Sequence, residues 1–452
     1  MGGSWDGNEN KIIPGVYQRY SSNDSVTIQP STRGIVTIPM ALSWGPVGVV
    51  QTIDAGADLT PYTGYDSIDA HNRWAQEMLK GTNRTSAPYR ILLYRLGGTG
   101  GEEATVTTGT LTATAKYPGV RGNDITIVIT DLTDPEDTFT VSTVVDGRIV
   151  DSQTAETADT LTANDWVTFS GTGALTSTVG APLTGGVDPT AAATDYSGYL
   201  TAIEPYRFDA MVYDGSDATV KTAMLSFIKR YFDDNGRQAQ LVAANLTNPD
   251  SRWAVNVVSG VTLDDGTELT PQQVCWWAGG ALAGAQYNED LTGASYPSAV
   301  EVSSKLTRSE LEAAIQAGQW VLQDDDNGTV SVVYDINSLV TYTSDITEPY
   351  HLNRTMRVAM VSGNDINDQF STRFKGVEDN DDAGRMNIKS ALVNYLLTMQ
   401  DNRGIQNFDG KTDVSVYQGK KADSVRVDAT LWVVGATNFI YVTWYISRER
   451  RA

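Results

Sequence analysis

The feature that most constrains the fold is a β-rich segment inside the chain, residues 102–186. It is rich in Thr, Ser, Gly and Val, and it contains short runs such as ITIVIT (125–130) and TFTVSTVV (138–145). Runs of this composition and period are typical of β-strands. Glycine-rich junctions mark both ends, GGTGG (97–101) before the segment and LTGGVD (183–188) after it. We therefore predict an inserted β-sandwich or small barrel.

The residues on both sides of this insertion predict an α/β domain, because strand and helix patterns alternate there. The expected strands are two within 33–53, broken at Trp44-Gly45-Pro46, and YRILLYRL (89–96), FDAMVYD (208–214) and RQAQLVAAN (237–245). The expected helices are 67–80, 190–204, 219–234 and 270–286. A hairpin is predicted where QWVLQ, the turn DDDNG (324–328) and TVSVVYDIN (329–337) follow one another.

The C-terminal quarter and the N-terminal residues predict strands without a partner in the same chain. Residues 387–405 form an amphipathic helical pattern, and strands are expected at 413–419 and roughly 424–446. Residues 1–27 indicate an extended arm, in which PGVY (14–17) places a Pro-Gly turn before β-prone residues. Exposed β-prone ends invite pairing with another chain, and head-to-tail donation builds rings or open helices. These ends favour a self-assembling structural protein.

Charge excludes some partners. The 33 basic and 55 acidic residues give a net charge of −22, which argues against nucleic acid or an anionic membrane as a binding surface. The charge is uneven, because residues 101–190 hold 3 basic against 13 acidic residues, whereas 346–452 hold 14 against 13. The acidic middle and the neutral C-terminal quarter are expected to face different surroundings.

The scarcity of cysteine and histidine disfavours several catalytic classes. Cys275, the single cysteine, permits no disulfide framework and no Cys-based zinc site, and beside two tryptophans on an apolar helix it indicates a buried thiol. His71 and His351 are the two histidines, and no G-x-S-x-G motif accompanies either of them. We therefore predict no hydrolase triad.

Three motifs come near to ligand sites and fall short of them. GIQNFDGKT (404–412) has Ile405 where a P-loop needs its first glycine, so a helix-to-strand turn is expected. QDDDNGTVSVVY (323–334) ends in Tyr334 where a calcium loop needs a bidentate carboxylate. The acidic run 378–382 indicates a solvated loop rather than a weak cation site. No cofactor, no metal and no enzymatic activity are expected.

Five segments, in order along the chain, resemble the contractile tail sheath proteins of myophages, defective prophages and tailocins. They are IPGVYQRY (13–20), RGIVTIPMALSWGPVG (33–48), YPGVRGNDITIVI (117–129), GTVSVVYDINSLVTY (328–342) and NRTMRVAMVSGNDINDQFSTRFKGVEDNDDAGRMNIKSALVNYLLTMQ (353–400). They are similar, in turn, to the family's N-terminal arm, first α/β segment, β-sandwich insertion, central hairpin and C-terminal domain.

The resemblance implies a multidomain fold of mixed α/β and α+β class. Its central α/β domain is subtilisin-like in fold and carries an inserted all-β sandwich, and its C-terminal α+β domain has extended strand-forming terminal arms. The implied divisions are an N-terminal arm (1–27), the first part of the α/β domain (28–100), the β-sandwich (101–188), the central subtilisin-like domain (189–345), the C-terminal sheath domain (346–427) and a C-terminal strand arm (428–452).

The resemblance also implies a mechanism. Sheath subunits form a helical homopolymer around an inner tail tube, and contraction drives the tube through the target cell envelope without any nucleotide. The implied partners are the tube, baseplate and tail terminator proteins, with no nucleic acid and no membrane insertion. The implied location is the virion tail, with assembly in the bacterial cytoplasm.

The resemblance further implies strand exchange between subunits through arms at about 10–27 and 428–447. The expected assembly residues are Pro14, Gly15, Val16 and Tyr17 in the first arm, Phe439, Tyr441, Val442 and Trp444 in the second, and Arg448, Arg450 and Arg451 in the basic tail.

Two other functions stay open at this point. One is a virion surface-binding protein with segment 102–186 as a lectin-like module. Exposed aromatic residues on this segment would favour that function. The segment offers Tyr117, Phe139, Trp166 and Phe169, and core packing can use all four. The other is a hydrolase on the α/β scaffold, which the two histidines disfavour.

Overall fold

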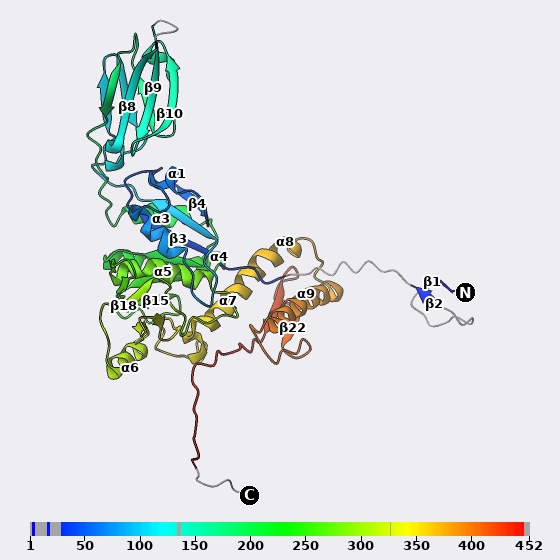
Figure 1. Cartoon of the computed structure of the whole chain (residues 1–452). Helices are drawn as coiled ribbons and strands as arrows, with labels where there is room; N and C mark the ends of the chain where they lie inside the picture. Colours follow the sequence, from blue (N-terminus) through cyan, green and yellow to red (C-terminus); the bar gives the residue numbers. More distant parts are fainter. Residues whose placement is uncertain (1, 5–15, 19–28, 133–136, 326, 447–452) are drawn as a thin grey trace. The chain divides into compact units, whose positions relative to one another are not determined.

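The computed structural model describes most of the chain as two compact units (Figure 1). The described residues are 2–4, 16–18, 29–132, 137–325 and 327–446. The larger unit comprises residues 31–367 and 435–452, and the smaller unit comprises residues 1–30 and 368–434. Within the described residues, no helix combines the length and the apolar character needed to cross a bilayer.

A seven-stranded sheet forms the centre of the larger unit, in the order β19-β15-β14-β13-β3-β5-β4. All neighbouring strands are parallel except β4, which runs antiparallel to β5 at one edge. The strands are β3 (Ile35–Met40), β4 (Val50–Asp54), β5 (Arg90–Arg95), β13 (Ala210–Tyr213), β14 (Gln240–Ala244), β15 (Ala254–Val257) and β19 (Gln319–Trp320). Most are buried on both faces, as expected for parallel strands covered by helices.

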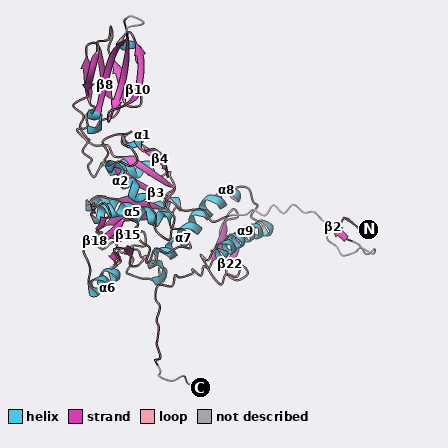
Figure 2. Ribbon diagram, in the orientation of Figure 1, coloured by secondary structure: helices cyan, strands magenta, loops and turns pink. Residues whose placement is uncertain are grey.

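Helices cover both faces of this sheet (Figure 2). Helices α2 (Arg73–Met78) and α5 (Pro271–Gly284) pack on one face, and α3 (Asp195–Ile203), α4 (Ala218–Asn235) and α7 (Asn353–Asp365) contribute to the core on the other. Alternation within each strand separates the two cores, so that Ile91 and Leu93 of β5 face one and Leu92 and Tyr94 the other.

The tight contact between α2 and α5 depends on a glycine. A Cβ atom on Gly280 would collide with the backbone carbonyl of Met78, so this position of α5 accommodates only glycine without a shift of α2. Helix α5 begins with a capping box formed by Thr270 and Gln273, which satisfies backbone N–H groups at its start.

Smaller elements complete the larger unit. A three-stranded sheet contains β16 (Val261–Leu263), β17 (Glu268–Leu269) and β18 (Ala299–Val302), and the hairpin contains β20 (Leu322–Asp324) and β21 (Val330–Val332). The short helix α1 (Thr60–Thr63) and helix α6 (Arg308–Gln316) lie outside the sheets. The predicted hairpin at 324–328 is confirmed, and the Asp325 carboxylate accepts the N–H groups of Asn327 and Thr329 in its turn.

The predicted β-sandwich is also confirmed, with sheet orders β10-β9-β8-β12 and β11-β7-β6 (Figure 1). Its strands are β6 (Thr105–Thr108), β7 (Leu111–Ala115), β8 (Ile125–Leu132), β9 (Thr138–Val145), β10 (Arg148–Ala155), β11 (Val167–Ser170) and β12 (Thr178–Pro182). Inward-facing residues of β7 and β8 alternate with exposed or half-buried ones and fill the core between the sheets.

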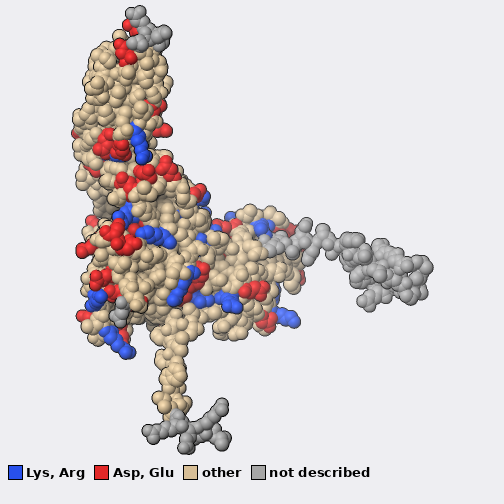
Figure 3. All heavy atoms as spheres, viewed as in Figure 1, with Lys and Arg blue, Asp and Glu red and all other residues tan. Residues whose placement is uncertain are grey.

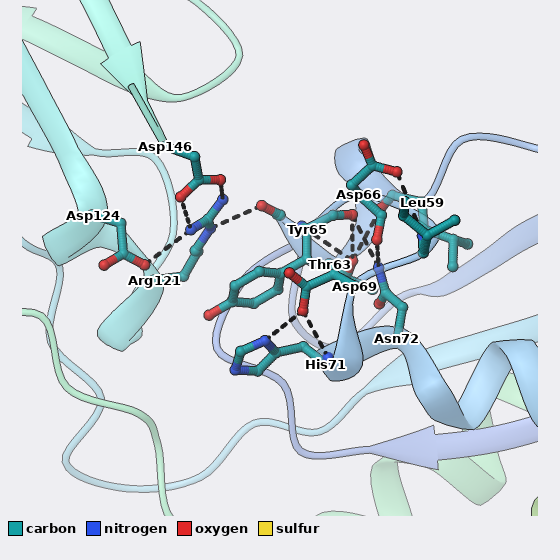
Figure 4. Close-up of polar contacts among 12 residues, drawn as sticks. Leu59, Thr63, Tyr65, Asp66, Asp69, His71, Asn72, Arg121, Asp124 and Asp146 are labelled. Carbon is teal, nitrogen blue, oxygen red and sulfur yellow. Dashed lines mark hydrogen bonds and ion pairs between the residues drawn. The ribbon is translucent and has the colours of Figure 1, made fainter. Parts of the chain in front are cut away.

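The sandwich is fastened to the α/β domain by an aromatic and an ionic contact. Trp44, from the loop after β3, belongs to the sandwich core and packs against Tyr117 and Trp166 at centroid distances of 5.3 and 4.9 Å. Arg121 of the sandwich lies 4.2 Å above the ring of Tyr65, and its Nε donates to the carbonyl oxygen of Gly64 (Figure 4). The two domains therefore share buried side chains as well as two chain crossings.

Acidic groups hold the Arg121 guanidinium in this place. Nη1 donates to Asp124 and Asp146 at 3.0 Å each, and Nη2 donates to Asp146 at 2.6 Å (Figure 4). The pairing with Arg121 lowers the pKa of Asp146 below its usual value. Because the Arg121 side chain is buried while both carboxylates are partly exposed, most of the desolvation falls on the arginine.

Replacing Arg121 with leucine is expected to destabilise the larger unit by about 1.5–3 kcal/mol, because hydrogen bonds to charged groups are lost. Urea denaturation of the full chain would measure the change, and faster protease cleavage at 97–101 should accompany it. Arg148→Leu, at an exposed position of β10, is the matched control and should change stability by less than about 0.5 kcal/mol. Equal stability of the two variants would contradict a fastening role for Arg121.

The smaller unit combines one long helix with a two-stranded sheet. It contains α8 (Ser371–Arg373), α9 (Asp382–Asp401), and the antiparallel strands β22 (Val414–Gln418) and β23 (Val425–Ala429). Strands β1 (Gly2–Ser4) and β2 (Val16–Gln18) form a separate parallel pair. The buried stripe of α9 ends at Met399, and the buried Val414 of β22 belongs to the same unit.

Several expected boundaries need correction. The strand predicted at roughly 424–446 is β23 only as far as Ala429, since Val433 forms only an isolated bridge with Ile405 and 435–446 has no strand partner among the described residues. The helix expected at 387–405 begins five residues earlier, where Asp381 caps it through the N–H of Gly384. The helix expected at 190–204 begins only at Asp195. The predicted helix-to-strand turn at 404–412 is confirmed.

Candidate assembly surface

The residues near the C-terminus expose an unusual run of large apolar side chains. Residues 435–446 are extended, and seven side chains within 439–446 are between 61 and 97% exposed. They are Phe439, Ile440, Tyr441, Val442, Trp444, Tyr445 and Ile446. Figure 3 shows no charged residue on this segment. A contiguous apolar surface of this kind marks a binding site for another protein surface.

The segment is apolar on both of its faces. In an extended chain, Phe439, Tyr441 and Tyr445 point to one side, and Ile440, Val442, Trp444 and Ile446 point to the other. A strand that is apolar on both sides is typical of one that is covered on both faces in its final sheet. Within the described structure, Phe439 packs edge-to-face on Tyr334 at a ring-centroid distance of 6.0 Å.

The residues just before the segment, 432–434, are hydrogen-bonded within the smaller unit. The N–H of Gln406 donates to the carbonyl oxygen of Trp432 at 2.8 Å, and the N–H of Val434 donates to that of Gly404 at 3.1 Å. These bonds form an antiparallel bridge between Ile405 and Val433. The chain is therefore held as far as Val434, and the exposed apolar run begins five residues later.

The sheet of the smaller unit has the features of a strand acceptor. Among the described residues the sheet contains β22 and β23 alone, and a two-stranded sheet is marginally stable without further strands. Helix α9 lies against β22, whereas Val427 of β23 stays 40% exposed, so an apolar part of the sheet remains uncovered. An added strand would extend the hydrogen-bonded ladder and bury this apolar surface.

The other face of this sheet is polar. The Tyr417 hydroxyl donates to the Asp428 carboxylate, and the Arg426 guanidinium lies over the Tyr417 ring and pairs with Asp428 at 3.2 Å. The hydrogen bond raises the pKa of Tyr417 and lowers that of Asp428. These contacts fix the register between β22 and β23, because Tyr417 is directly opposite Arg426 in the ladder.

The predicted assembly residues fall into three groups: some lie in a strand, some in the exposed C-terminal run, and some outside the described residues. Val16 and Tyr17 lie in β2, where they pair with Gly2 and Gly3 of β1. Phe439, Tyr441, Val442 and Trp444 all belong to the exposed C-terminal run. Pro14, Gly15, Arg448, Arg450 and Arg451 lie outside the described residues.

Three exposed residues of the run were not predicted as assembly residues. Ile440, Tyr445 and Ile446 are at least as exposed as several of the predicted ones. The signal that identifies them is the absence of polar alternation between 439 and 446, since a half-exposed strand would place polar residues at every second position.

The histidines and the cysteine have structural partners. The exposed His71 stacks on Tyr65 and lies 2.7 Å from Asp69 (Figure 4). His351 lies 2.7 Å from the carbonyl oxygen of Leu339, and burial lowers its pKa. The prediction of a buried thiol at Cys275 is confirmed, and burial raises its pKa. The described residues contain no group of three or more His, Cys, Asp and Glu that could hold a metal ion.

The aromatic residues of the β-sandwich contribute to its own core. Trp166 is buried, and Tyr117, Phe139 and Phe169 are half-buried against the same cluster. Core packing thus uses the four aromatic side chains on which a lectin-like surface would depend.

Family comparisons divide the chain into three matched regions. Residues 99–188 match the phage tail sheath protein beta-sandwich domain, residues 190–338 match the phage tail sheath protein central domain, and residues 345–447 match the phage tail sheath C-terminal domain. Together these matches cover well over half of the chain.

Individual proteins show the same similarity. The phage-like element PBSX protein XkdK of Bacillus subtilis (strain 168) is 31% identical, over 97% of this chain and 98% of its own length. The crystal structure of a sheath tail protein from Desulfitobacterium hafniense is 41% identical, with a TM-score of 0.84 over 93% of this chain and 96% of its own. The anti-feeding prophage helical sheath in its contracted state shares the fold at 11% identity, with a TM-score of 0.59 over 96% of this chain and 99% of its own.

Proposed function

The chain belongs to the phage tail sheath protein family and is a structural sheath subunit of a contractile tail, and on this premise we propose that its terminal segments link neighbouring subunits by strand exchange. The C-terminal segment of one subunit adds a strand to the β22–β23 sheet of a neighbour, with residues 439–442 of the segment in the ladder. The N-terminal residues that include Val16 and Tyr17 add to the same kind of sheet from another neighbour.

The observation that carries the proposal is the seven exposed apolar side chains at 439–446. Full burial of one such side chain contributes about 1.5–3 kcal/mol relative to leaving it in water, so a free segment of this composition is strongly driven to associate. Its own β22–β23 sheet offers uncovered apolar surface and strand edges. In identical subunits, donor and acceptor occur in every copy, which suits a heterologous, open helical assembly.

The proposed polymer surrounds an inner tail tube and contracts to drive the tube through the target cell envelope. Extended links between folded units allow the units to rotate while the subunits stay connected. Baseplate and tail terminator proteins are the proposed partners at the two ends, and assembly in the bacterial cytoplasm is the proposed origin. The free energy of contraction is proposed to come from differences between subunit interfaces, so that no nucleotide is needed.

We also propose that the chain catalyses no reaction and that its central domain is subtilisin-like. The mostly parallel sheet with helices on both faces supports the fold assignment. Support for the absence of catalysis comes from the exposed position of His71 and the hydrogen bond of His351 to a backbone carbonyl. The six domain ranges expected from the sequence remain part of the proposal.

Negative-stain electron microscopy of the purified chain, alone and with its tube protein, would test the linkage. The unchanged chain is expected to form hollow tubes with regular cross-striations. Changing Ile440 and Val442 to lysine together should reduce the amount of tube at least tenfold, because two charges would have to be buried with the donated strand. Ile149→Lys combined with Val179→Lys, at exposed apolar positions of the sandwich, is the matched control. Tubes of normal amount from the Ile440/Val442 variant would contradict strand donation by this segment.

A further inference from the structure

A groove of about 560 Å³ on the larger unit is separate from the strand-exchange surfaces. Strands β18 and β20 line it, together with the start of α6. Its apolar lining includes Val300, Leu306, Leu311 and Leu322, of which Val300 and Leu306 are exposed to solvent. A volume of this size holds a few side chains of a peptide rather than a folded domain.

The polar lining of the groove is acidic. Glu301 comes from β18, and Asp324, whose side chain is only 9% exposed, comes from β20. Lys305 bridges the two strands, with its Nζ 3.4 Å from Glu301 and 3.0 Å from Asp324. The Lys305 side chain itself is 65% exposed, so a cationic group occupies the solvent side of a nearly buried carboxylate. This arrangement favours a ligand that is both apolar and basic.

The end of this chain has that composition. Its last ten residues, TWYISRERRA (443–452), begin with the exposed Trp444, Tyr445 and Ile446 and continue with three arginines and one glutamate. The net charge of this basic segment is therefore +2, and that of Glu301, Asp324, Asp325 and Lys305 together is −2. Arginine matches carboxylates better than lysine does, because its planar guanidinium can donate two parallel hydrogen bonds.

We propose that the groove between β18 and β20 binds residues 443–452 of a second copy of this chain. This inference rests on the proposed strand exchange, in which residues 439–442 would form the donated strand. Ten further residues can extend about 33 Å beyond that strand. Trp444 and its apolar neighbours cover the leucine side chains, and the arginines pair with Glu301 and Asp324. Both β18 and β20 are edge strands of their sheets, so the bound peptide also has backbone groups to pair with.

A fluorescent peptide of residues 443–452 and the purified full chain allow a direct test by anisotropy. We expect saturable binding that weakens with salt and weakens about tenfold or more when Glu301→Gln and Asp324→Asn are combined. Replacing the three arginines of the peptide with glutamine should have an effect of similar size and leaves the folded chain unchanged. Glu102→Gln with Glu103→Gln, an equal change in charge elsewhere on the larger unit, is the matched control.

Several results would overturn the inference. One is a peptide that does not bind, and another is equal binding to the Glu301/Asp324 variant and the unchanged chain. A peptide that binds only after the chain's own three arginines are replaced would assign the groove to the tail of the same chain. None of these results bears on strand exchange, because the Ile440/Val442 tube experiment would stand by itself.

Discussion

Replacing Arg357 with methionine is expected to lower the free energy of unfolding of the larger unit by about 3–5 kcal/mol. Arg357 lies on α7 and its Nη2 donates to Asp335 at 2.6 Å, with both side chains completely buried. Nη2 also donates to the carbonyl oxygen of Glu289 at 2.8 Å. Without the arginine, the Asp335 carboxylate would be left as a buried charge lacking its cationic partner.

Other groups donate to the same carboxylate and connect it to neighbouring elements. The N–H of Leu291 donates to Asp335 Oδ2 at 3.1 Å, and the Asn353 side chain donates to Asp335 Oδ1 at 2.9 Å. Asn353 in turn accepts a hydrogen bond from Gln240 at the start of β14. One ion pair therefore holds the segment after β21, helix α7 and the central sheet together, and its loss loosens all three.

Urea denaturation of the full chain followed by circular dichroism would measure the change. The matched control is Arg308→Met on α6, because Arg308 is 92% exposed and pairs with Glu312 at the surface. That change should shift stability by less than about 0.5 kcal/mol. A loss below about 1 kcal/mol for Arg357→Met would show that Asp335 is adequately held by its remaining hydrogen bonds.

The elements that could be predicted from the sequence are those whose pattern is set locally. Alternation in ITIVIT and TFTVSTVV identifies β8 and β9 of the sandwich, because each strand has one face in the core. The continuous apolar run YRILLYRL identifies β5, because a strand in the middle of a helix-covered sheet is buried on both faces. The hairpin turn DDDNG is also set locally, because the Asp325 carboxylate accepts hydrogen bonds from the backbone N–H groups of Asn327 and Thr329.

Helix α7 was not predicted, because five of its nine buried residues are polar or charged. Asn353, Arg357, Asn364 and Asp365 are buried beside Met356 and Met360, so polar residues interrupt the apolar pattern of the buried face. Their partners, such as Asp335 and Gln238, are remote in sequence, and only the folded chain brings them together. Such partners offset the free-energy cost of burying a charged side chain. Because they are distant in sequence, a local sequence pattern cannot reveal them.

The C-terminal segment shows a different limit. Its β-prone composition predicts a strand, but a strand needs hydrogen-bond partners, and one copy of the chain supplies none for 435–446 among the described residues. In the proposed assembly, a neighbouring subunit would supply these partners. The same limit applies to the groove, because within one copy its acidic residues pair with Lys305, and the arginines that we propose as their further partners come from a second copy.

Deleting residues 1–20 is expected to abolish long tubes while leaving folded subunits. The deletion removes β1 and β2, including Val16 and Tyr17, and with them the proposed donated N-terminal strand. Each subunit would lose one of two links to its neighbours, so rings and short stacks become the largest stable assemblies. The thermal unfolding midpoint should stay the same, since the cores of both units lie within 31–434.

Electron microscopy of the truncated and full-length chains, prepared with the same tube protein, would measure tube length. A double substitution, Val16→Asp with Tyr17→Asp, tests whether pairing of the strand matters rather than the presence of the N-terminal residues. It keeps the full length of the chain but puts two charges on the strand, which opposes its burial. Both variants should shorten tubes, whereas exposed sandwich changes such as Val179→Lys should not. Tubes of normal length from the truncated chain would place the entire linkage in the C-terminal segment, because the exposed run at 439–446 would then suffice to join one subunit to the next.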